Sequence, residues 1–104
     1  MSRIVNILSQ QVQERQQQGE KLRIIDVREQ EEVAQGIIPG AVHIRLSELP
    51  NRLSEIDKSA ETIFVCRGGN RSSMACEYLL DLGYTNVKNL MGGMNGWDGP
   101  IEKR

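Results

Sequence analysis

A cysteine followed by a short, cationic, glycine-rich segment is the part of this sequence best suited to chemistry. Cys66 precedes the segment RGGNR at positions 67–71, and no acidic residue occurs between Phe64 and Met74. The thiolate is the nucleophilic form of cysteine, and nearby positive charge or hydrogen-bond donors lower the pKa of the thiol that produces it. The segment therefore indicates a reactive thiol at Cys66.

Three features of this segment favour ionisation of Cys66 near neutral pH. It leads into a helix expected from Ser72, and a helix N-terminus stabilises an anion by about 0.3 to 1 kcal/mol. This corresponds to about one pKa unit, because one unit is about 1.4 kcal/mol. Gly68 and Gly69 can turn successive backbone N–H groups inward, and hydrogen bonds from such a nest are expected to contribute more. Arg67 and Arg71 add two positive charges.

The two cysteines differ in their predicted surroundings. Cys66 ends an apolar run, where a free cysteine can also serve as a small buried hydrophobe, so packing remains the alternative to reactivity. Cys76 falls in the middle of the following helix, beside its apolar face, and is expected to pack there. The sequence has no CxxC pair and a single histidine, His43, which are too few ligands for a zinc site. Because a preformed thiolate needs no general base, His43 is expected to have a strand or surface role.

Short apolar runs alternate with helical patterns along the chain. Buried strands are predicted at 22–27 and 63–65, with a final short strand at 87–91. This alternation predicts an α/β fold of three layers, with a mostly parallel sheet between helices. Functional sites in such sheets gather at the carboxyl ends of the strands, where Asp26 and Cys66 fall.

Helical patterns occupy the segments between and around these strands. They are expected in the glutamine-rich residues 10–18, in 29–35, in 46–56 with Pro50 in the first turn, and from Ser72 to a C-cap at Gly83. In the last of these helices, the spacing predicts one shared apolar face for Met74, Ala75, Tyr78, Leu79 and Leu82.

Length, charge and hydropathy exclude several classes of protein. The 104 residues are enough for one core, so residues 1–104 are expected to form a single domain. A net charge of -1 offers no field for a phosphate backbone or an anionic membrane, and neither nucleic acid nor membrane is expected as a partner. No apolar run is long enough for a membrane helix or a secretion signal, so a cytoplasmic protein is expected.

Four ordered motifs of this sequence together resemble those of the single-domain rhodaneses, a family of sulfurtransferases. They are DVR at 26–28, GIIPGA at 36–41, CRGGNRS at 66–72 and GGMNGW at 92–97, and the similarity runs from Leu22 to Trp97. It implies a five-stranded parallel sheet and a catalytic Cys66 that takes up a sulfur atom as a persulfide. It also implies an active-site loop made of Arg67, Gly68, Gly69, Asn70 and Arg71, supported by an ion pair of Asp26 and Arg28.

The reaction implied by this resemblance is a double displacement. The Cys66 thiolate attacks the outer sulfur of thiosulfate or of a persulfide donor, and a thiol or cyanide then removes that sulfur from Cys66. No metal or organic cofactor is required. The implied partners are a small-molecule sulfur donor and a thiol acceptor, among them a thioredoxin-like or persulfide-carrying protein.

Two other functions stay open beside this one. A cysteine phosphatase or arsenate reductase uses a similar loop, but with five residues between cysteine and arginine, whereas four separate Cys66 from Arg71. The shorter ring leaves less room for a tetrahedral oxyanion. A non-catalytic binding module with the same fold is the second alternative, and retention of the thiol argues against it.

Overall fold

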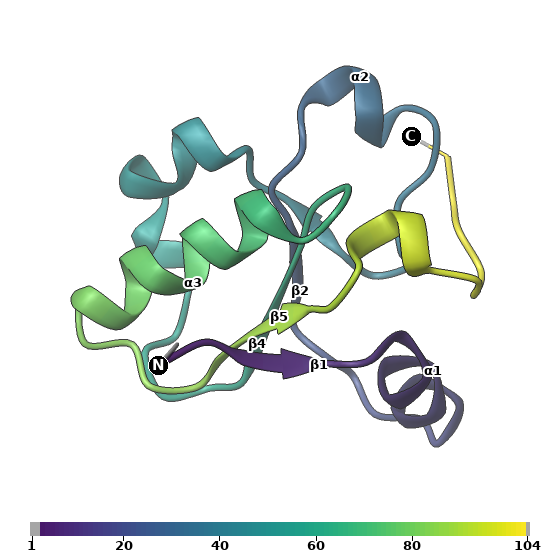
Figure 1. The fold of residues 1–104 in the computed structure, drawn as a ribbon, viewed down its shortest axis with the longest axis horizontal. Coiled ribbons are helices and arrows are strands. Elements are labelled where there is room, and N and C mark those ends of the chain that lie inside the picture. The colour runs from purple at the N-terminus through teal and green to yellow at the C-terminus, as the bar shows by residue number, and fades with distance from the viewer. Residues whose placement is uncertain (1–2, 104) are drawn as a thin grey trace.

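A sheet of five parallel strands forms the centre of the computed structural model, which describes residues 3–103 (Figure 1). The strands are β1 (Val5–Ile7), β2 (Ile24–Asp26), β3 (Val42–His43), β4 (Thr62–Val65) and β5 (Val87–Leu90). They lie in the order β1-β5-β4-β2-β3, and every neighbouring pair is parallel. The predicted α/β class is confirmed, and so are the strands expected within 22–27, 63–65 and 87–91.

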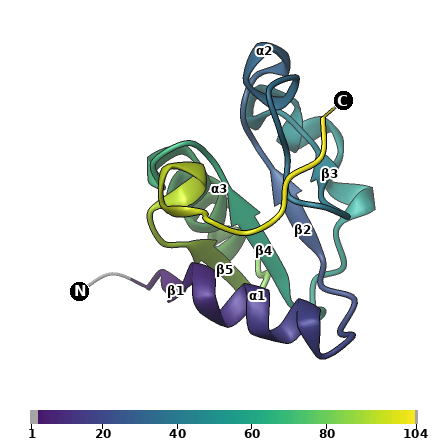
Figure 2. The same cartoon turned by 90° about the vertical axis from the view of Figure 1, so that its right-hand side faces the viewer.

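Helices cover both faces of this sheet, and Figure 2 shows its strands side by side in this order. They are α1 (Ser9–Gln17), α2 (Gln30–Val33) and α3 (Asn70–Asp81). Because side chains alternate along a strand, Ile25 and Phe64 pack in one apolar cluster with α3. Ile24, Ile63 and Val65 point the other way and pack in a second cluster with α1, α2 and the C-terminal segment.

The edge strand β1 has no clear signal in the sequence. Of its three residues only Ile7 is buried, so the apolar pattern that marks β2 and β4 is missing. Pairing with β5 holds β1 in the sheet, with Asn6 opposite Asn89 and Ile7 opposite Leu90.

Residues 46–56 depart from the single helix predicted for them. They form two 3-10 helices, η1 (Leu46–Asn51) and η2 (Leu53–Glu55), and Pro50 lies near the end of η1 rather than in its first turn. The N–H of Arg52 donates to the carbonyl of Leu49 at 3.1 Å, which closes the tighter turn of a 3-10 helix. Proline has no N–H to donate, which favours a break in the α-helical ladder here.

The helix that follows Cys66 also differs in detail from its prediction. It begins at Asn70 rather than Ser72, and Gly83, with φ of +92°, lies just past its end. Met74 is 61% exposed and Leu82 41%, so the prediction that they share the buried face is wrong. Ala75 and Leu79 are buried on that face as predicted, together with Ser72 and Cys76. Among residues 3–103, no helix is long and apolar enough to cross a membrane.

Candidate active site

Cys66 lies at the carboxyl end of β4, one residue past the strand, and the loop after it leads into α3. β2 pairs directly with β4, with Asp26 opposite Val65. The fold therefore places Cys66 and Asp26 at the same end of the sheet, as the strand pattern predicts.

Hydrogen-bond donors converge on the sulfur of Cys66. The backbone N–H of Gly69 donates to Sγ at 3.0 Å, and the hydroxyl oxygen of Ser72 lies 3.2 Å from it. Burial by itself raises the pKa of the Cys66 thiol, since the residue is only 1% exposed. The hydrogen bonds from the Ser72 side chain and from the N–H groups of Ser72, Gly69 and Gly68 together outweigh burial, and the pKa lies below its ordinary value.

One of the two loop glycines has a conformation that other residues avoid. Gly69 has φ of +107° and forms the N-cap of α3, so its N–H can point back to Sγ. Gly68 does not have a positive φ, and a Cβ added to it would meet only the Nδ2 atom of Asn95, at 4.0 Å. The backbone freedom expected at both glycines is therefore needed at Gly69 alone.

The segment that begins at Gly92 and Gly93 holds the loop by two backbone hydrogen bonds. In η3 (Gly93–Gly96), the N–H of Met94 donates to the carbonyl of Cys66 at 2.8 Å, and the N–H of Asn95 donates to that of Arg67 at 2.9 Å. A Cβ on Gly93 would lie 2.4 Å from the Cys66 carbonyl oxygen. The close approach that fixes the loop thus requires glycine at this position.

The positive charge expected from Arg71 is largely taken up by a carboxylate. Arg71 donates from Nη1 and Nη2 to the two carboxylate oxygens of Glu32 in α2, at 2.7 and 2.9 Å. The sequence between Phe64 and Met74 has no acidic residue, but the fold supplies one from outside it. Arg67 is exposed and, within the described residues, forms no salt bridge.

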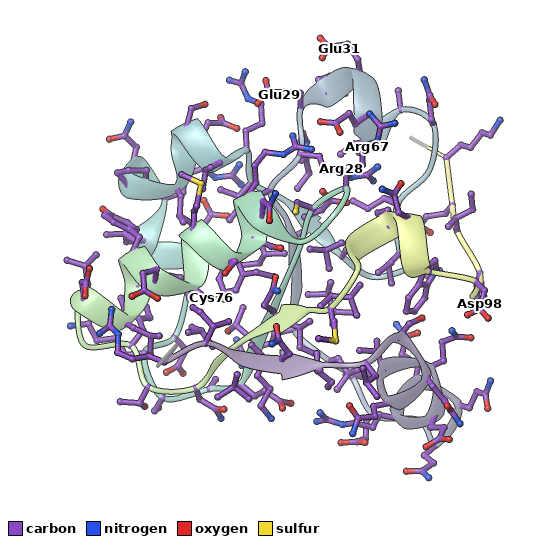
Figure 3. All side chains as sticks on the ribbon, in the orientation of Figure 1. Arg28, Glu29, Glu31, Arg67, Cys76 and Asp98 are labelled. Atoms are coloured by element: carbon purple, nitrogen blue, oxygen red, sulfur yellow. The ribbon has the colours of Figure 1, made fainter. Side chains whose placement is uncertain are left out.

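A pocket with a volume of about 530 Å³ opens beside the loop. Arg67, Arg28 and Glu32 contribute polar groups to its wall, and Met94 and Trp97 contribute apolar ones. Figure 3 shows Arg67 and Arg28 on the side of the molecule where α2 lies, with Glu31 at the outer end. The volume is typical of sites for small molecules.

Comparison with known proteins decides the family of this chain. Residues 8–99 match the family model described as a rhodanese-like domain. The chain belongs to the rhodanese-like domain family. It is 45% identical over 101 residues to the putative sulfurtransferase YtwF of Bacillus subtilis, a match that covers 97% of each chain. It is 39% identical over 89 residues to a sulfurtransferase of Allochromatium vinosum, covering 86% of this chain and 83% of that one.

Solved structures agree with this assignment. The crystal structure of a rhodanese-like domain protein from Staphylococcus aureus matches with a TM-score of 0.90 and 32% sequence identity, over 97% of this chain and 99% of that one. The rhodanese fold predicted from the four motifs is thereby confirmed.

In this rhodanese-like domain, Asp26 and Arg28 form a buried ion pair. The Nε atom of Arg28 lies 3.0 Å from both carboxylate oxygens of Asp26, and Nη2 lies 2.9 Å from Oδ2. Nη2 also donates to the carbonyl of Gly36 at 2.7 Å. The pair therefore ties the end of β2 to the segment after α2, on one wall of the pocket.

Other candidate groups of the rhodanese-like domain lie elsewhere. Cys76, labelled in Figure 3, lies on the buried face of α3, and burial raises the pKa of its thiol to about 12. The ring Nε2 of His43 lies 2.6 Å from the carbonyl oxygen of Arg28 and is engaged there. No group of three or more metal-ligating side chains gathers in the described part of the chain.

Two residues that matter to the geometry are missed by reasoning from the sequence. Ser72 lies inside a quoted motif, but the sequence marks it only as a helix start, whereas its hydroxyl contacts Sγ. Glu32 lies 39 residues from Arg71 along the chain. Only the fold brings the two together, and no local pattern indicates the pair.

We expect iodoacetamide to alkylate Cys66 at least about thirtyfold faster than Cys76 at mildly acidic pH. The pKa of Cys76 is about 12, more than three units above the ordinary cysteine value of about 8.5, and that of Cys66 lies below its ordinary value. The thiolate fractions then differ by about a thousandfold, and the lower nucleophilicity of the more acidic thiol offsets about half of that on a logarithmic scale. Peptide mapping after timed quenching measures both rates, and equal rates would contradict the pKa difference.

We expect the link between Glu32 and Arg71 to stabilise the fold near neutral pH and to fail in acid. Hydrogen bonds from Arg71 lower the pKa of Glu32 to about 2, from an ordinary value of 4.5. A carboxylate with a lowered pKa contributes stability above its unfolded pKa and loses it as the pH falls toward its folded pKa. Glu32 also accepts from the N–H of Glu29 at 3.0 Å. Glu32→Gln should therefore lower the free energy of unfolding by about 1–2 kcal/mol at pH ~7.

Urea unfolding of both proteins at a series of pH values checks this expectation. The difference between wild type and Glu32→Gln should shrink below pH 4.5 and be nearly gone at about pH 2. A difference that stays constant over this range would show that the carboxylate charge of Glu32 has no part in it.

Proposed function

We propose that this protein is a sulfurtransferase in which Cys66 carries a sulfane sulfur as a persulfide. The proposal rests on the hydrogen-bond donors that point at Sγ of Cys66, just before α3 begins. The Gly69 N–H lies 3.0 Å and the Ser72 hydroxyl 3.2 Å from Sγ. Donors held at this distance stabilise negative charge on sulfur.

The proposed reaction has two displacements. In the first, the Cys66 thiolate attacks the outer sulfur of thiosulfate, the sulfur–sulfur bond of the donor breaks, and sulfite leaves with the bonding pair. Cys66 then holds the outer sulfur as a persulfide. In the second, a thiolate or cyanide attacks that sulfur, the bond to Sγ breaks, and the Cys66 thiolate is restored. The scheme uses no metal and no organic cofactor.

The residues around Cys66 have distinct parts in this scheme. Gly69 and Ser72 hold the charge on Sγ, with the N–H of Gly68 beside them. Exposed Arg67 lines the pocket and is placed to attract an anionic donor, and Asn70, three residues further along the chain, begins α3. Arg71 with Glu32 ties the loop to α2, and Asp26 with Arg28 ties β2 to the segment after α2 on the wall of the pocket.

The names of two relatives bear on the donor and the acceptor of this reaction. Among them are a putative sulfur carrier protein of Bacillus subtilis and a thiosulfate sulfurtransferase of Pseudomonas entomophila. By analogy, we propose thiosulfate or a persulfide as the donor. A low-molecular-weight thiol, or the thiol of a thioredoxin-like protein, would then be the acceptor.

Intact-mass measurement after incubation with thiosulfate tests the proposal. The expected result is a gain of the mass of one sulfur atom, mapped to the peptide that holds Cys66 and reversed by cyanide with release of thiocyanate. An unmodified protein that still folds would overturn the proposal and favour a binding module. Turnover of an aryl phosphate with sensitivity to vanadate would favour a phosphatase instead.

A further inference from the structure

The hydroxyl group of Ser72 lies among three acceptors but has one proton to give. Its oxygen is 2.5 Å from Oδ1 of Asn89, 3.2 Å from the carbonyl oxygen of Gly69 and 3.2 Å from Sγ of Cys66. Ser72 itself is fully buried, so no solvent competes for the proton. A hydroxyl donates once and accepts through its lone pairs. The acceptor that takes the hydroxyl proton therefore decides whether Ser72 donates a hydrogen bond to Cys66 or can only accept one from it.

The amide of Asn89 continues this contact to the edge of the sheet. Asn89 in β5 is the register partner of Asn6 in β1, and its Nδ2 donates to Oδ1 of Asn6 at 3.0 Å. Asn89 is only 6% exposed, whereas Asn6 is exposed. A chain of hydrogen bonds thus runs from Cys66 through Ser72 and Asn89 to a residue that meets solvent.

The direction of this chain suits the thiol form of Cys66. Oδ1 of Asn89 lies 2.5 Å from the Ser72 oxygen and Sγ of Cys66 lies 3.2 Å from it, and the shorter contact favours donation of the hydroxyl proton to Asn89. The oxygen of Ser72 is then free to accept from the S–H of Cys66. In this direction every donor points outward, toward Asn6.

The thiolate form needs the opposite direction. An ionised Sγ requires the Ser72 proton, and this would leave the Ser72 oxygen facing Oδ1 of Asn89 with no proton between them. A half-turn of both amides removes the conflict: Asn6 donates to Asn89, Asn89 donates to Ser72, and Ser72 donates to Sγ. The two ends of a side-chain amide are nearly equal in size. Because Asn6 is exposed, water can satisfy either end of its amide.

We propose that Asn89 and Asn6 are positioning residues that reverse the hydrogen-bond chain through Ser72 and so let it donate to the Cys66 thiolate. The inference rests on the proposed use of Cys66 as a thiolate, but not on transfer of sulfur. It assigns a role to two polar residues, from β5 and β1, that lie outside the active-site loop.

Apart from exposed Arg67, the charged groups near Cys66 are held by other partners. Arg71 acts on Cys66 through its charge and is bound to Glu32 of α2, while Asp26 of β2 is bound to Arg28. Among the described hydrogen bonds, none joins these side chains to the amides of Asn89 or Asn6. The direction of the amide chain can therefore be changed without altering these ion pairs.

Asn6→Asp tests the proposal, because a carboxylate can only accept. The carboxylate at position 6 accepts a hydrogen bond from Nδ2 of Asn89. This fixes Oδ1 of Asn89 toward Ser72, the orientation that suits the thiol form of Cys66. We expect the pKa of Cys66 to rise by about one unit, with alkylation by iodoacetamide about tenfold slower below that pKa. The thiolate absorbance in the ultraviolet measures the pKa without any sulfur donor, so the result is separate from the persulfide assay.

Val5→Asp is the charge-matched control for this experiment. Val5 is the preceding residue of β1, 53% exposed, and its side chain points to the opposite face of the sheet from Asn6. It adds the same charge to the same strand but cannot reach Asn89, so the titration of Cys66 should match the wild type. An equal rise in both variants would overturn the proposal, as would no rise with Asn6→Asp.

A double-mutant cycle with Ser72→Ala separates the hydrogen-bond chain from charge acting through space. Without the hydroxyl group, no hydrogen bond links the amide of Asn89 to Sγ of Cys66. Asn6→Asp should then leave the pKa of Cys66 where Ser72→Ala alone puts it. A rise as large as that in the wild-type background would show that the new charge acts directly, and the proposal would be wrong.

Discussion

Cys66→Ser is expected to lower kcat/KM for sulfur transfer from thiosulfate to cyanide by at least about a thousandfold. Removal of a covalent nucleophile leaves only the contribution of binding, and a serine hydroxyl does not ionise near neutral pH. The substitution keeps nearly the same shape in a buried position, where the Gly69 N–H and the Ser72 hydroxyl can still bond the new oxygen. The rate of thiocyanate formation measures the loss.

Cys76→Ala is the matched control for this change. Both cysteines are buried in the same apolar cluster, but the pKa of Cys76 is raised to about 12 and no loop amide is aimed at it. We expect this variant to keep most of the activity and to lose some stability. Loss of activity with Cys76→Ala, or retention with Cys66→Ser, would show that the sulfur is carried elsewhere.

Gly93→Ala is expected to be the most damaging substitution of a residue that does not touch the sulfur. Its Cβ would lie 2.4 Å from the carbonyl oxygen of Cys66 and 2.6 Å from that of Arg67, and both are backbone atoms that cannot rotate away. The loop must shift, which breaks the bonds from Met94 and Asn95 that hold it. We expect the free energy of unfolding to fall by about 3 kcal/mol or more. A loop displaced by about 1 Å should also reduce kcat/KM by about a hundredfold.

Gly92→Ala separates this clash from backbone strain. Gly92 has φ of +78° and Gly93 has φ of +55°, so alanine is disfavoured at both. A Cβ on Gly92, however, would meet only the Cα of Gly96, at 3.8 Å. We expect a loss of about 1–2 kcal/mol, with the pKa of Cys66 unchanged. Urea unfolding and thiol titration of both variants check this, and equal effects would show that contact with the loop is not what requires Gly93.

The parts of the site that lie close together in the sequence could be predicted from it. The apolar run that ends at Cys66, the glycine at position 69 and the helix that follows are contiguous, so the meeting of N–H groups and sulfur follows from local geometry. The partner of Arg71 could not be predicted in this way. From the sequence alone, an arginine in a loop without acidic neighbours is predicted to form no ion pair. Only the packing of α2 against the loop brings Glu32 to Arg71.

Tertiary context also explains where the predicted elements were wrong. Met74 and Leu82 have helical spacing with the apolar residues of α3, but the sheet contacts a narrower face of that helix. In residues 46–56 the spacing of leucines is compatible with an α-helix and with successive 3-10 turns. The difference depends on backbone hydrogen bonds around Pro50, which spacing does not report.

The most direct test of the account is the pKa of the Cys66 thiol in the unmodified protein. Thiolate absorbance followed from about pH 4 to 9 should report this group alone among the cysteines, because Cys76 titrates at about 12. A midpoint below the ordinary cysteine value of about 8.5 is predicted, since the loop and Ser72 bond the charged sulfur. A midpoint at or above that value would mean that burial raises the pKa more than the hydrogen bonds lower it. The loop would then not stabilise a thiolate at Cys66.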